Sequence, residues 1–286
     1  MKARNFRYIR PTSLQHAYRI LQEGDAVALA GGQSLLAGLN MRLSAPKLLV
    51  DIGELKELAG ASHDDGEIRL GALTRHRELL QSALVRARLP LLARAAAHIG
   101  HVAIRNRGTL GGSLAYADPA AELPACSVAL GATLVLGSLA GEREVKAEDF
   151  FKDLFETDLR PGELIVAVKF PAPGAKTSVG FAELARRHGD FALAGLAAVA
   201  TIQENQIETA RLVYFGCVER AKVAESVSAA VAGLRLPVED AAAFANAVHQ
   251  DLTPDDTPGL RADTKLHMAT VLTRRVLNAL SEKAAA

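Results

Sequence analysis

Two glycine pairs beside small polar side chains are the residues of this sequence best suited to binding phosphate. The segment AGGQS covers residues 30–34, the first glycine turn, and TLGGS covers residues 109–113, the second glycine turn. Backbone N–H groups in such turns, helped by the partial positive charge of a helix N-terminus, bind anions without a lysine. A pyrophosphate needs donors from more than one side, so the two turns together predict a dinucleotide site, although either pair alone could be a tight turn. The side-chain donors expected there are Gln33, Ser34, Thr109 and Ser113.

Two carboxylates follow the second glycine turn. Asp118-Pro119 is typical of a helix cap with proline in the first turn, and Glu122 stands one turn later. Acidic residues after a phosphate turn accept hydrogen bonds from sugar hydroxyls in other dinucleotide sites. Glu122 is therefore either a ligand of sugar or polyol hydroxyls or a solvated charge at a helix start.

Other kinds of site and partner find little support. No GxGxxG or GxxxxGK[ST] motif is present, and residues 32–36 fail the GxSxG pattern at Leu36. Cys126 and Cys217 stand far apart without a CxxC or Cys/His cluster, so neither a metal site nor a disulfide is predicted. The 33 basic and 32 acidic residues give a net charge of +1, which disfavours nucleic acid. With no apolar leader and only short alanine-rich apolar runs, we expect no membrane span and a cytoplasmic location.

The helices and strands that position these residues can be predicted from apolar periodicity and from capping, glycine and proline residues. A buried strand at residues 27–30 runs into the first glycine turn and a helix at 35–43, after a helix capped by Ser13. Thr74 is a candidate cap for a helix at 75–81, and Pro90 begins a helix that ends at Gly100. The pattern predicts mixed α+β halves rather than repeated βαβ units. Further strands are expected at 48–52, 68–70, 132–137, 163–170, 178–185, 197–203 and 207–215, and late helices at 221–231, 237–249 and 263–282.

The order and spacing of these motifs resemble a known family. Besides the two glycine turns, the chain has IRN at 104–106, ADP at 117–119, LP at 123–124 and RRHGDF at 186–191. In these segments it resembles the FAD-binding medium subunits of the molybdenum hydroxylases, the family of carbon monoxide dehydrogenase medium chains and the flavin domain of xanthine dehydrogenase. The resemblance implies an α+β fold. Residues 1–55 and 56–173 would form a two-part FAD-binding domain of the vanillyl-alcohol oxidase and MurB type (PCMH-like), and residues 176–286 a C-terminal α+β domain with an antiparallel sheet and helices.

The same resemblance implies a set of FAD-binding residues. The two glycine turns would bind the pyrophosphate and Glu122 the ribityl chain, with other positions near the flavin or adenine and an aromatic ring at 191 beside the isoalloxazine. The full set is Leu29, Ala30, Gly31, Gly32, Gln33, Ser34, Leu35, Ile99, Gly100, Thr109, Gly111, Gly112, Ser113, Glu122, Ile165 and Phe191. This chain departs from the family where Ser113 replaces a frequent Asn, Glu122 a commoner Asp, Glu183 a lysine and Phe191 a tyrosine.

The function implied by the resemblance is electron transfer within a complex. An iron–sulfur small subunit with two [2Fe-2S] clusters would pass electrons from a molybdopterin large subunit to FAD in this chain and on to an external acceptor, in a dimer of heterotrimers. No general acid or base is assigned here. Arg186 and Arg187, if adjacent on a strand, point to opposite faces, so only one can contact flavin or partner; the histidines are expected at the surface. The alternatives are a stand-alone FAD-dependent oxidase or reductase and a non-redox nucleotide-binding assembly protein.

Overall fold

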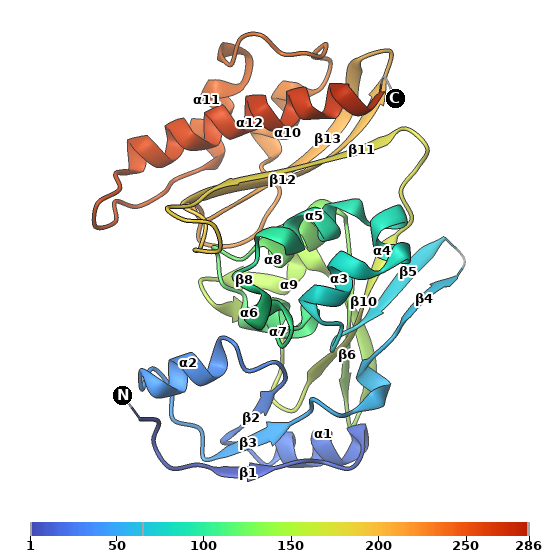
Figure 1. Cartoon of the computed structure of the whole chain (residues 1–286), viewed down its shortest axis with the longest axis vertical. Helices are drawn as coiled ribbons and strands as arrows, with labels where there is room; N and C mark the ends of the chain where they lie inside the picture. The colour runs from blue at the N-terminus through green and yellow to red at the C-terminus, as the bar shows by residue number, and fades with distance from the viewer. Residues whose placement is uncertain (1, 65, 285–286) are drawn as a thin grey trace.

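The computed structural model describes residues 2–64 and 66–284 and shows three parts along the long axis of the molecule (Figure 1). The first part is a three-stranded parallel sheet in the order β1-β3-β2. Its strands are β1 (Arg7–Ile9), β2 (Ala26–Leu29) and β3 (Leu48–Asp51), connected by α1 (Leu14–Gln22) and α2 (Leu35–Asn40). As expected, Ser13 caps α1 by accepting from the backbone N–H of His16 at 3.2 Å.

The parallel pairing in this first part corrects the sequence interpretation. Parallel strands need a crossover connection, and here α1 and α2 supply the two crossovers, so residues 7–51 do contain successive βαβ units. Strands of three or four residues carry too little pattern to distinguish parallel from antiparallel pairing.

The second part is a five-stranded antiparallel sheet in the order β4-β5-β10-β6-β7. Strand β10 is central and contributes to two cores. Leu164 and Val166 pack with α1 and the first part, while Val168 and Phe170 pack with the helices of the second part. The strands are β4 (Ala61–Asp64), β5 (Glu67–Gly71), β6 (Thr133–Ser138), β7 (Gly141–Lys146) and β10 (Leu164–Pro171), with a small hairpin of β8 (Phe151–Asp153) and β9 (Glu156–Thr157) and a 3-10 turn, η1 (Lys56–Leu58). The helices are α3 (His76–Gln81), α4 (Ala83–Arg88), α5 (Pro90–His98), α6 (Val102–Arg105), α7 (Leu110–Tyr116), α8 (Glu122–Ala129) and α9 (Ala147–Phe150).

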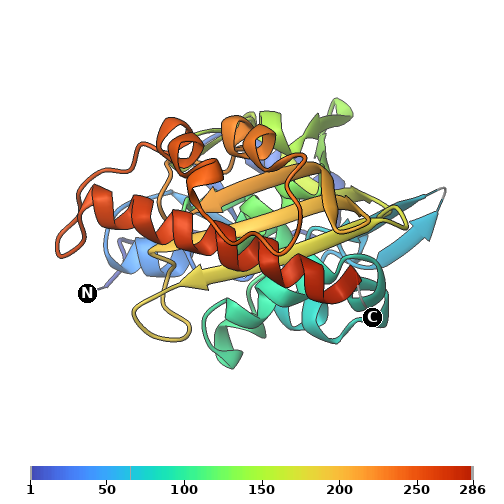
Figure 2. The same cartoon turned by 90° about the horizontal axis from the view of Figure 1, so that it is seen from above.

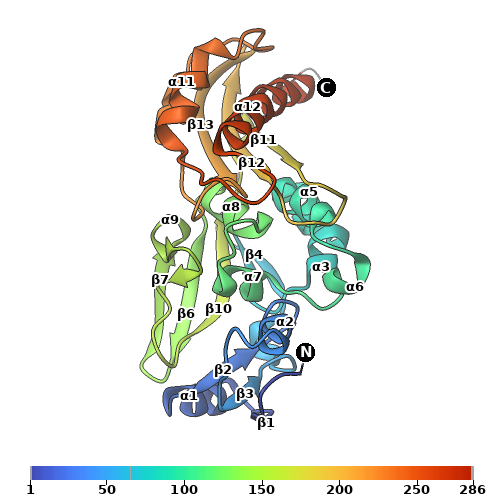
Figure 3. The ribbon, with the colours of Figure 1, turned by 90° about the vertical axis from the view of Figure 1, so that its left-hand side faces the viewer.

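The third part is an antiparallel sheet between two layers of helices. Its strands are β11 (Thr177–Leu184), β12 (Ala194–Gln203) and β13 (Gln206–Phe215), and its helices are α10 (Glu225–Val231), α11 (Ala242–Asp251) and α12 (Ala262–Ala284). Helix α12 runs across the outer face (Figure 2), and α5 and α8 of the second part lie against the inner face (Figure 3). The inner face of this sheet therefore joins the core of the second part.

Several helix starts differ from those expected. Helix α3 has Arg75, not Thr74, at its N-cap, since the Thr74 hydroxyl donates to the carbonyl of Gly71 at 2.7 Å. Helix α10 begins four residues late because Val223 pairs with Val213. Helix α11 begins at Ala242 because Val238 is bound to Asn278 of α12 by a 2.7 Å bond from its backbone N–H. Within the described residues, no helix has the length and apolar character needed to cross a bilayer.

Candidate functional site

A cavity of about 880 Å³ lies where the three parts meet. This is toward the upper end of the usual range for cofactor sites. The first part contributes residues around β2 and the first glycine turn, the second part contributes α7 and the wall before β10, and the third part contributes Gly189, Asp190 and Phe191. Every residue in the set expected from sequence lines this cavity except Leu29, which is half-buried at the end of β2.

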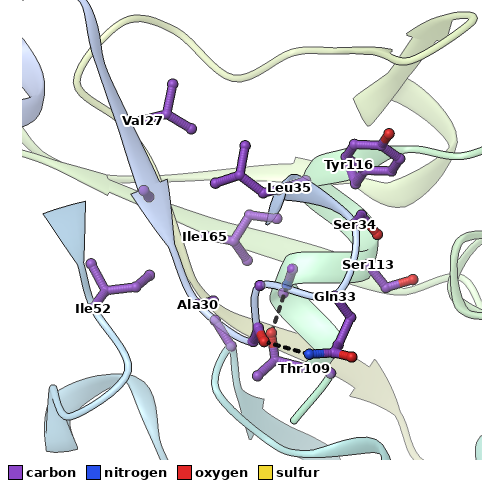
Figure 4. Close-up of a pocket in the computed structure, with 18 of the residues that line it drawn as sticks. Val27, Ala30, Gln33, Ser34, Leu35, Ile52, Thr109, Ser113, Tyr116 and Ile165 are labelled. Atoms are coloured by element: carbon purple, nitrogen blue, oxygen red, sulfur yellow. Dashed lines mark hydrogen bonds between the residues drawn. The ribbon is translucent and has the colours of Figure 1, made fainter. Parts of the chain in front are cut away.

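The first glycine turn presents an unbroken row of open backbone donors. Strand β2 ends at Leu29 and α2 begins at Leu35, and the N–H groups of residues 31–35 donate to no group in the described parts of the chain. Gly32 takes the left-handed conformation, with a φ of 72°, that this sharp change of direction requires. The side chain of Gln33 folds back and donates from Nε2 to the Gly31 carbonyl at 3.1 Å (Figure 4). Gln33 therefore stabilises the turn, and the N–H groups of residues 31–35 remain available to bind an anion.

The second glycine turn is built differently, and here the expectation of a second row of free N–H groups is wrong. Its N–H groups are already used: Leu110 donates to Thr74 at 2.9 Å, Gly111 to Ala72 at 2.8 Å, and Gly112 and Ser113 to Thr109 Oγ1 and O at 3.1 and 3.0 Å. Thr109 is the N-cap of α7, so it occupies the donors of that helix start. The second glycine turn instead contributes the hydroxyls of Thr109 and Ser113 to the cavity (Figure 4).

The glycines also bring the two turns together. A Cβ on Gly31 would lie 2.2 Å from the carbonyl oxygen of Arg107, and one on Gly111 would lie 2.6 Å from the Cβ of Ala72. Gly112 differs, because a Cβ there would crowd only the Thr109 hydroxyl, at 2.7 Å, with Ala30 at ordinary contact distance. Gly31 and Gly111 thus allow close packing of the protein itself, while Gly112 keeps a surface of the cavity open.

Two residues that the sequence did not single out support the second turn. His76, 6% exposed, has Nε2 3.0 Å from the carbonyl of Thr109, and the Arg75 guanidinium donates to the carbonyl of Arg107. Burial lowers the pKa of His76 to about 4, so the ring is neutral and its Nε2–H donates. The expectation that the histidines lie at the surface is therefore wrong for His76. Nothing in the local sequence distinguishes it from the exposed histidines.

The carboxylates lie as follows. Glu122 is the first residue of α8, lines the cavity and is only 8% exposed, so the alternative of a solvated charge is wrong. Burial, and to a lesser degree the charges of Glu183 and Asp118, raises the pKa of Glu122 to about 8. Asp118 does not cap α8, whose N-cap is Ala121; it accepts from Ala120 N–H at 2.9 Å and caps the preceding turn. Burial also raises the pKa of Asp118.

Arg143 on β7, which no sequence motif indicated, supports the cavity wall formed by residues 159–165. The Arg143 guanidinium donates to both carboxylate oxygens of Glu163 at 2.7 Å and to Asp158 Oδ2 at 2.7 Å. These groups stand 15 and 20 residues from Arg143 and meet only because β7 and β10 belong to one sheet. A fork of five fixed donors suits such paired carboxylates.

The third part reaches the cavity through the connection between β11 and β12. Phe191, 66% exposed, and Gly189 line the cavity from this connection, and Gly189 packs against Gly100. Arg186 and Arg187 are exposed on the same connection, beyond the end of β11. The argument that they point to opposite faces of a strand therefore does not hold.

Comparison with known proteins identifies the class. Residues 4–173 match the FAD binding domain in molybdopterin dehydrogenase, and residues 180–280 match the CO dehydrogenase flavoprotein C-terminal domain. With the cavity described above, these matches define an FAD-binding oxidoreductase subunit. The chain belongs to the FAD-binding medium subunits of the molybdenum hydroxylases, so the family, fold class and cofactor expected from sequence are confirmed.

Relatives resemble the chain over nearly its whole length. It is 40% identical to the 6-hydroxypseudooxynicotine dehydrogenase complex subunit alpha of Paenarthrobacter nicotinovorans, covering 97% of this chain and 95% of that one. It is 27% identical to the xanthine dehydrogenase FAD-binding subunit of Escherichia coli O157:H7, over 95% and 94% of the two chains. Among solved structures, carbon monoxide dehydrogenase from Hydrogenophaga pseudoflava superposes with a TM-score of 0.95 at 35% identity, covering 99% of both chains.

Proposed function

We propose that FAD lies in this cavity with its pyrophosphate against the first glycine turn. The observation that carries the proposal is the row of N–H groups without an acceptor at residues 31–35, all of which line a cavity of about 880 Å³. Thr109 and Ser113 also line this cavity, and their side-chain hydroxyls can donate hydrogen bonds to the pyrophosphate. Ala30, Gly31 and Gly32 bring the backbone close, and Gln33 holds the turn in shape.

The remaining residues bind the rest of the cofactor. Glu122 meets the hydroxyls of the ribityl chain, and Ile99, Gly100 and Ile165 form apolar contacts with the flavin or adenine. The exposed ring of Phe191 covers the isoalloxazine from the third part. Leu29 does not touch the cofactor; its side chain lies 3.2 Å from the Cβ position of Gly32 and supports the turn from behind.

In this function the chain relays electrons between protein partners. FAD, when bound, accepts and releases one or two electrons, and the chain's own groups bind it and set its surroundings without acting as general acid or base. Electrons arrive from an iron–sulfur small subunit, which receives them from a molybdopterin large subunit, and leave to an external acceptor. The names of the relatives as medium chains and complex subunits support this arrangement. The complex would be a dimer of heterotrimers, as the family resemblance implies. A reducing cytoplasm fits the two cysteines of this chain, which are both free and buried.

The test begins with the purified chain and its chromophore. We expect a yellow protein that releases FAD on denaturation and takes it up again on renaturation. Candidate substrates should leave the flavin of the isolated chain oxidised, and reduction should follow only when the molybdenum and iron–sulfur partners are added. A colourless chain that cannot bind FAD would contradict the proposal and favour the non-redox alternative. Rapid bleaching of the isolated chain by a substrate would instead favour a stand-alone oxidase or reductase.

A further inference from the structure

Tyr116 lines the cavity but is not one of the residues expected from sequence. It is the last residue of α7 and follows Ser113 by three positions, so the two side chains lie on the same face of this helix. In Figure 4 both side chains project from α7 on the side that carries the cavity. Tyr116 is 36% exposed, so part of its ring is open to a ligand.

A second aromatic ring contacts Tyr116 from outside the cavity. Phe155 lies in the connection between β8 and β9, with its ring centroid 5.3 Å from that of Tyr116 and the two planes at 71°. This is the edge-to-face geometry that aromatic pairs prefer. Phe155 has a φ of 56°, a left-handed conformation that a bulky residue rarely adopts, and it is 50% exposed. The hairpin thus holds Phe155 against Tyr116 instead of burying it in the core, and the contact fixes the orientation of the Tyr116 ring.

Tyr116 is at the opposite end of α7 from the contacts that lead to the third part. A Cβ on Gly189 would lie 3.1 Å from the carbonyl oxygen of Gly100. Cβ atoms on Gly100 and Gly108 would in turn lie 2.8 and 3.2 Å from atoms of Ile104. Gly108 directly precedes the N-cap of α7, so the third part meets the cavity near the start of this helix. At 1.5 Å per residue, Tyr116 lies about 10 Å farther along the helix.

The cavity also extends away from the third part, between residues 24–28 of the first part and residues 159–163 of the wall. The β8–β9 hairpin that carries Phe155 leads directly into this wall. With the isoalloxazine beside Phe191 and the pyrophosphate at the first glycine turn, this other end is where the adenosine half of FAD lies. An adenine ring is flat and aromatic, and every base can stack on an aromatic side chain through its π-face.

We propose that Tyr116 is a further cofactor-binding residue, whose ring stacks on the adenine of FAD. Phe155 is a positioning residue, since it holds the Tyr116 ring and does not itself line the cavity. This adenine contact rests on the proposed function, because the direction of the cofactor follows from placing its flavin beside Phe191. The Tyr116 ring, rather than its hydroxyl, makes the contact, so phenylalanine at this position keeps it.

The test uses three ligands that separate the two halves of the cofactor. The FAD-free full-length chain is titrated by calorimetry with FAD, with ADP, which carries the adenosine and the pyrophosphate, and with FMN, which carries the flavin. Tyr116→Ala should weaken FAD and ADP by the same factor, about tenfold or more, and leave FMN within about twofold. Tyr116→Phe should bind all three ligands within about twofold of the wild type. Leu154→Ala is the matched control on the same hairpin, since Leu154 is 54% exposed and does not line the cavity, and it should alter nothing.

A double-mutant cycle tests the role of Phe155. Phe155→Ala should weaken FAD and ADP by less than Tyr116→Ala does, because the Tyr116 ring remains but is no longer held in place. The double variant should bind no more weakly than Tyr116→Ala alone. Losses that simply add would show that Phe155 acts independently of Tyr116.

The possible failures are distinguishable. If Tyr116→Ala binds ADP as tightly as the wild type, or loses FMN affinity as much as FAD affinity, the adenine contact is overturned while the proposed function stands. Binding by Tyr116→Phe as weak as that by Tyr116→Ala would overturn stacking in favour of the hydroxyl. A wild-type chain that binds neither FAD nor ADP would contradict the proposed function and the adenine contact together. Melting temperatures establish that each variant is folded.

Discussion

Gly31→Ala is the sharpest test of the first glycine turn, because the obstacle it meets is backbone. The added methyl carbon would lie 2.2 Å from the carbonyl oxygen of Arg107, 2.8 Å from its carbonyl carbon and 2.9 Å from the Cα of Gly108. None of these atoms can rotate away as a side chain could. Ordinary contact lies near 3.4 Å, so the two loops must separate by about 1 Å, at a cost of about 1–3 kcal/mol for overpacking.

The consequence for binding follows from the geometry of hydrogen bonds. A displacement of about 1 Å takes a donor at a normal distance out of range. Each bond to a charged oxygen contributes about 1.5–3 kcal/mol, and every 1.4 kcal/mol is about tenfold in affinity. If the shift removes two of the N–H donors in residues 31–35, FAD should bind about 10²- to 10⁴-fold more weakly.

The assay is a fluorescence titration of the purified chain with FAD, accompanied by scanning calorimetry. The matched control is Gly38→Ala, also near the first glycine turn but within α2, where a Cβ meets no atom within 4 Å. That change should leave FAD affinity unaltered and stabilise the helix by up to about 1 kcal/mol. Wild-type affinity in a folded Gly31→Ala chain would refute the assignment of the pyrophosphate to this turn.

Four further predictions concern residues that line the cavity or support its wall. Gly112→Val places a branched side chain at the second glycine turn, where its Cβ would crowd the Thr109 hydroxyl that caps α7. FAD affinity by titration should fall at least about tenfold and stability by about 1 kcal/mol; full occupancy would show that the second turn is misassigned. Asp118→Asn should change affinity less than about threefold, since asparagine also caps the turn. Arg143→Ala removes the hydrogen bonds to Glu163 and Asp158 and should lower stability by about 1–3 kcal/mol, measured as a lower Tm, and should weaken FAD binding. An unchanged Tm would show that Arg143 does not stabilise this wall. Burial raises the pKa of Glu122 from 4.5 to about 8, so its contribution to stability is fully present at low pH and is lost as pH rises through about 8. The FAD-free wild type should therefore lose Tm relative to Glu122→Gln between about pH 5 and 9, and parallel curves would argue against a buried Glu122.

Local features were readable from sequence because their causes lie within a few residues. A short apolar strand, a glycine pair and a following helix predicted the first glycine turn, although β2 is half-buried rather than buried. Ser13 and Pro90 marked helix starts correctly. Glu204 and Asn205 form the turn between the strands expected at 197–203 and 207–215, and both take a positive φ, which asparagine tolerates well. Motif order along the whole chain then indicated the family.

Packing decided what those features can do. Both glycine turns pair glycines with small polar residues, yet only the first keeps its N–H groups free. In the second turn, Ala72 and Thr74, next to β5, accept from Gly111 and Leu110, and Thr109 accepts from Gly112 and Ser113. The same dependence on distant segments buries Glu122, which is 8% exposed, in the wall of the cavity. A sequence specifies which donors, acceptors and charges a segment carries. Which of these groups remain unpaired, and which pKa values shift, depends on the segments that pack against them. Those neighbours are fixed only when the sheets and helices assemble.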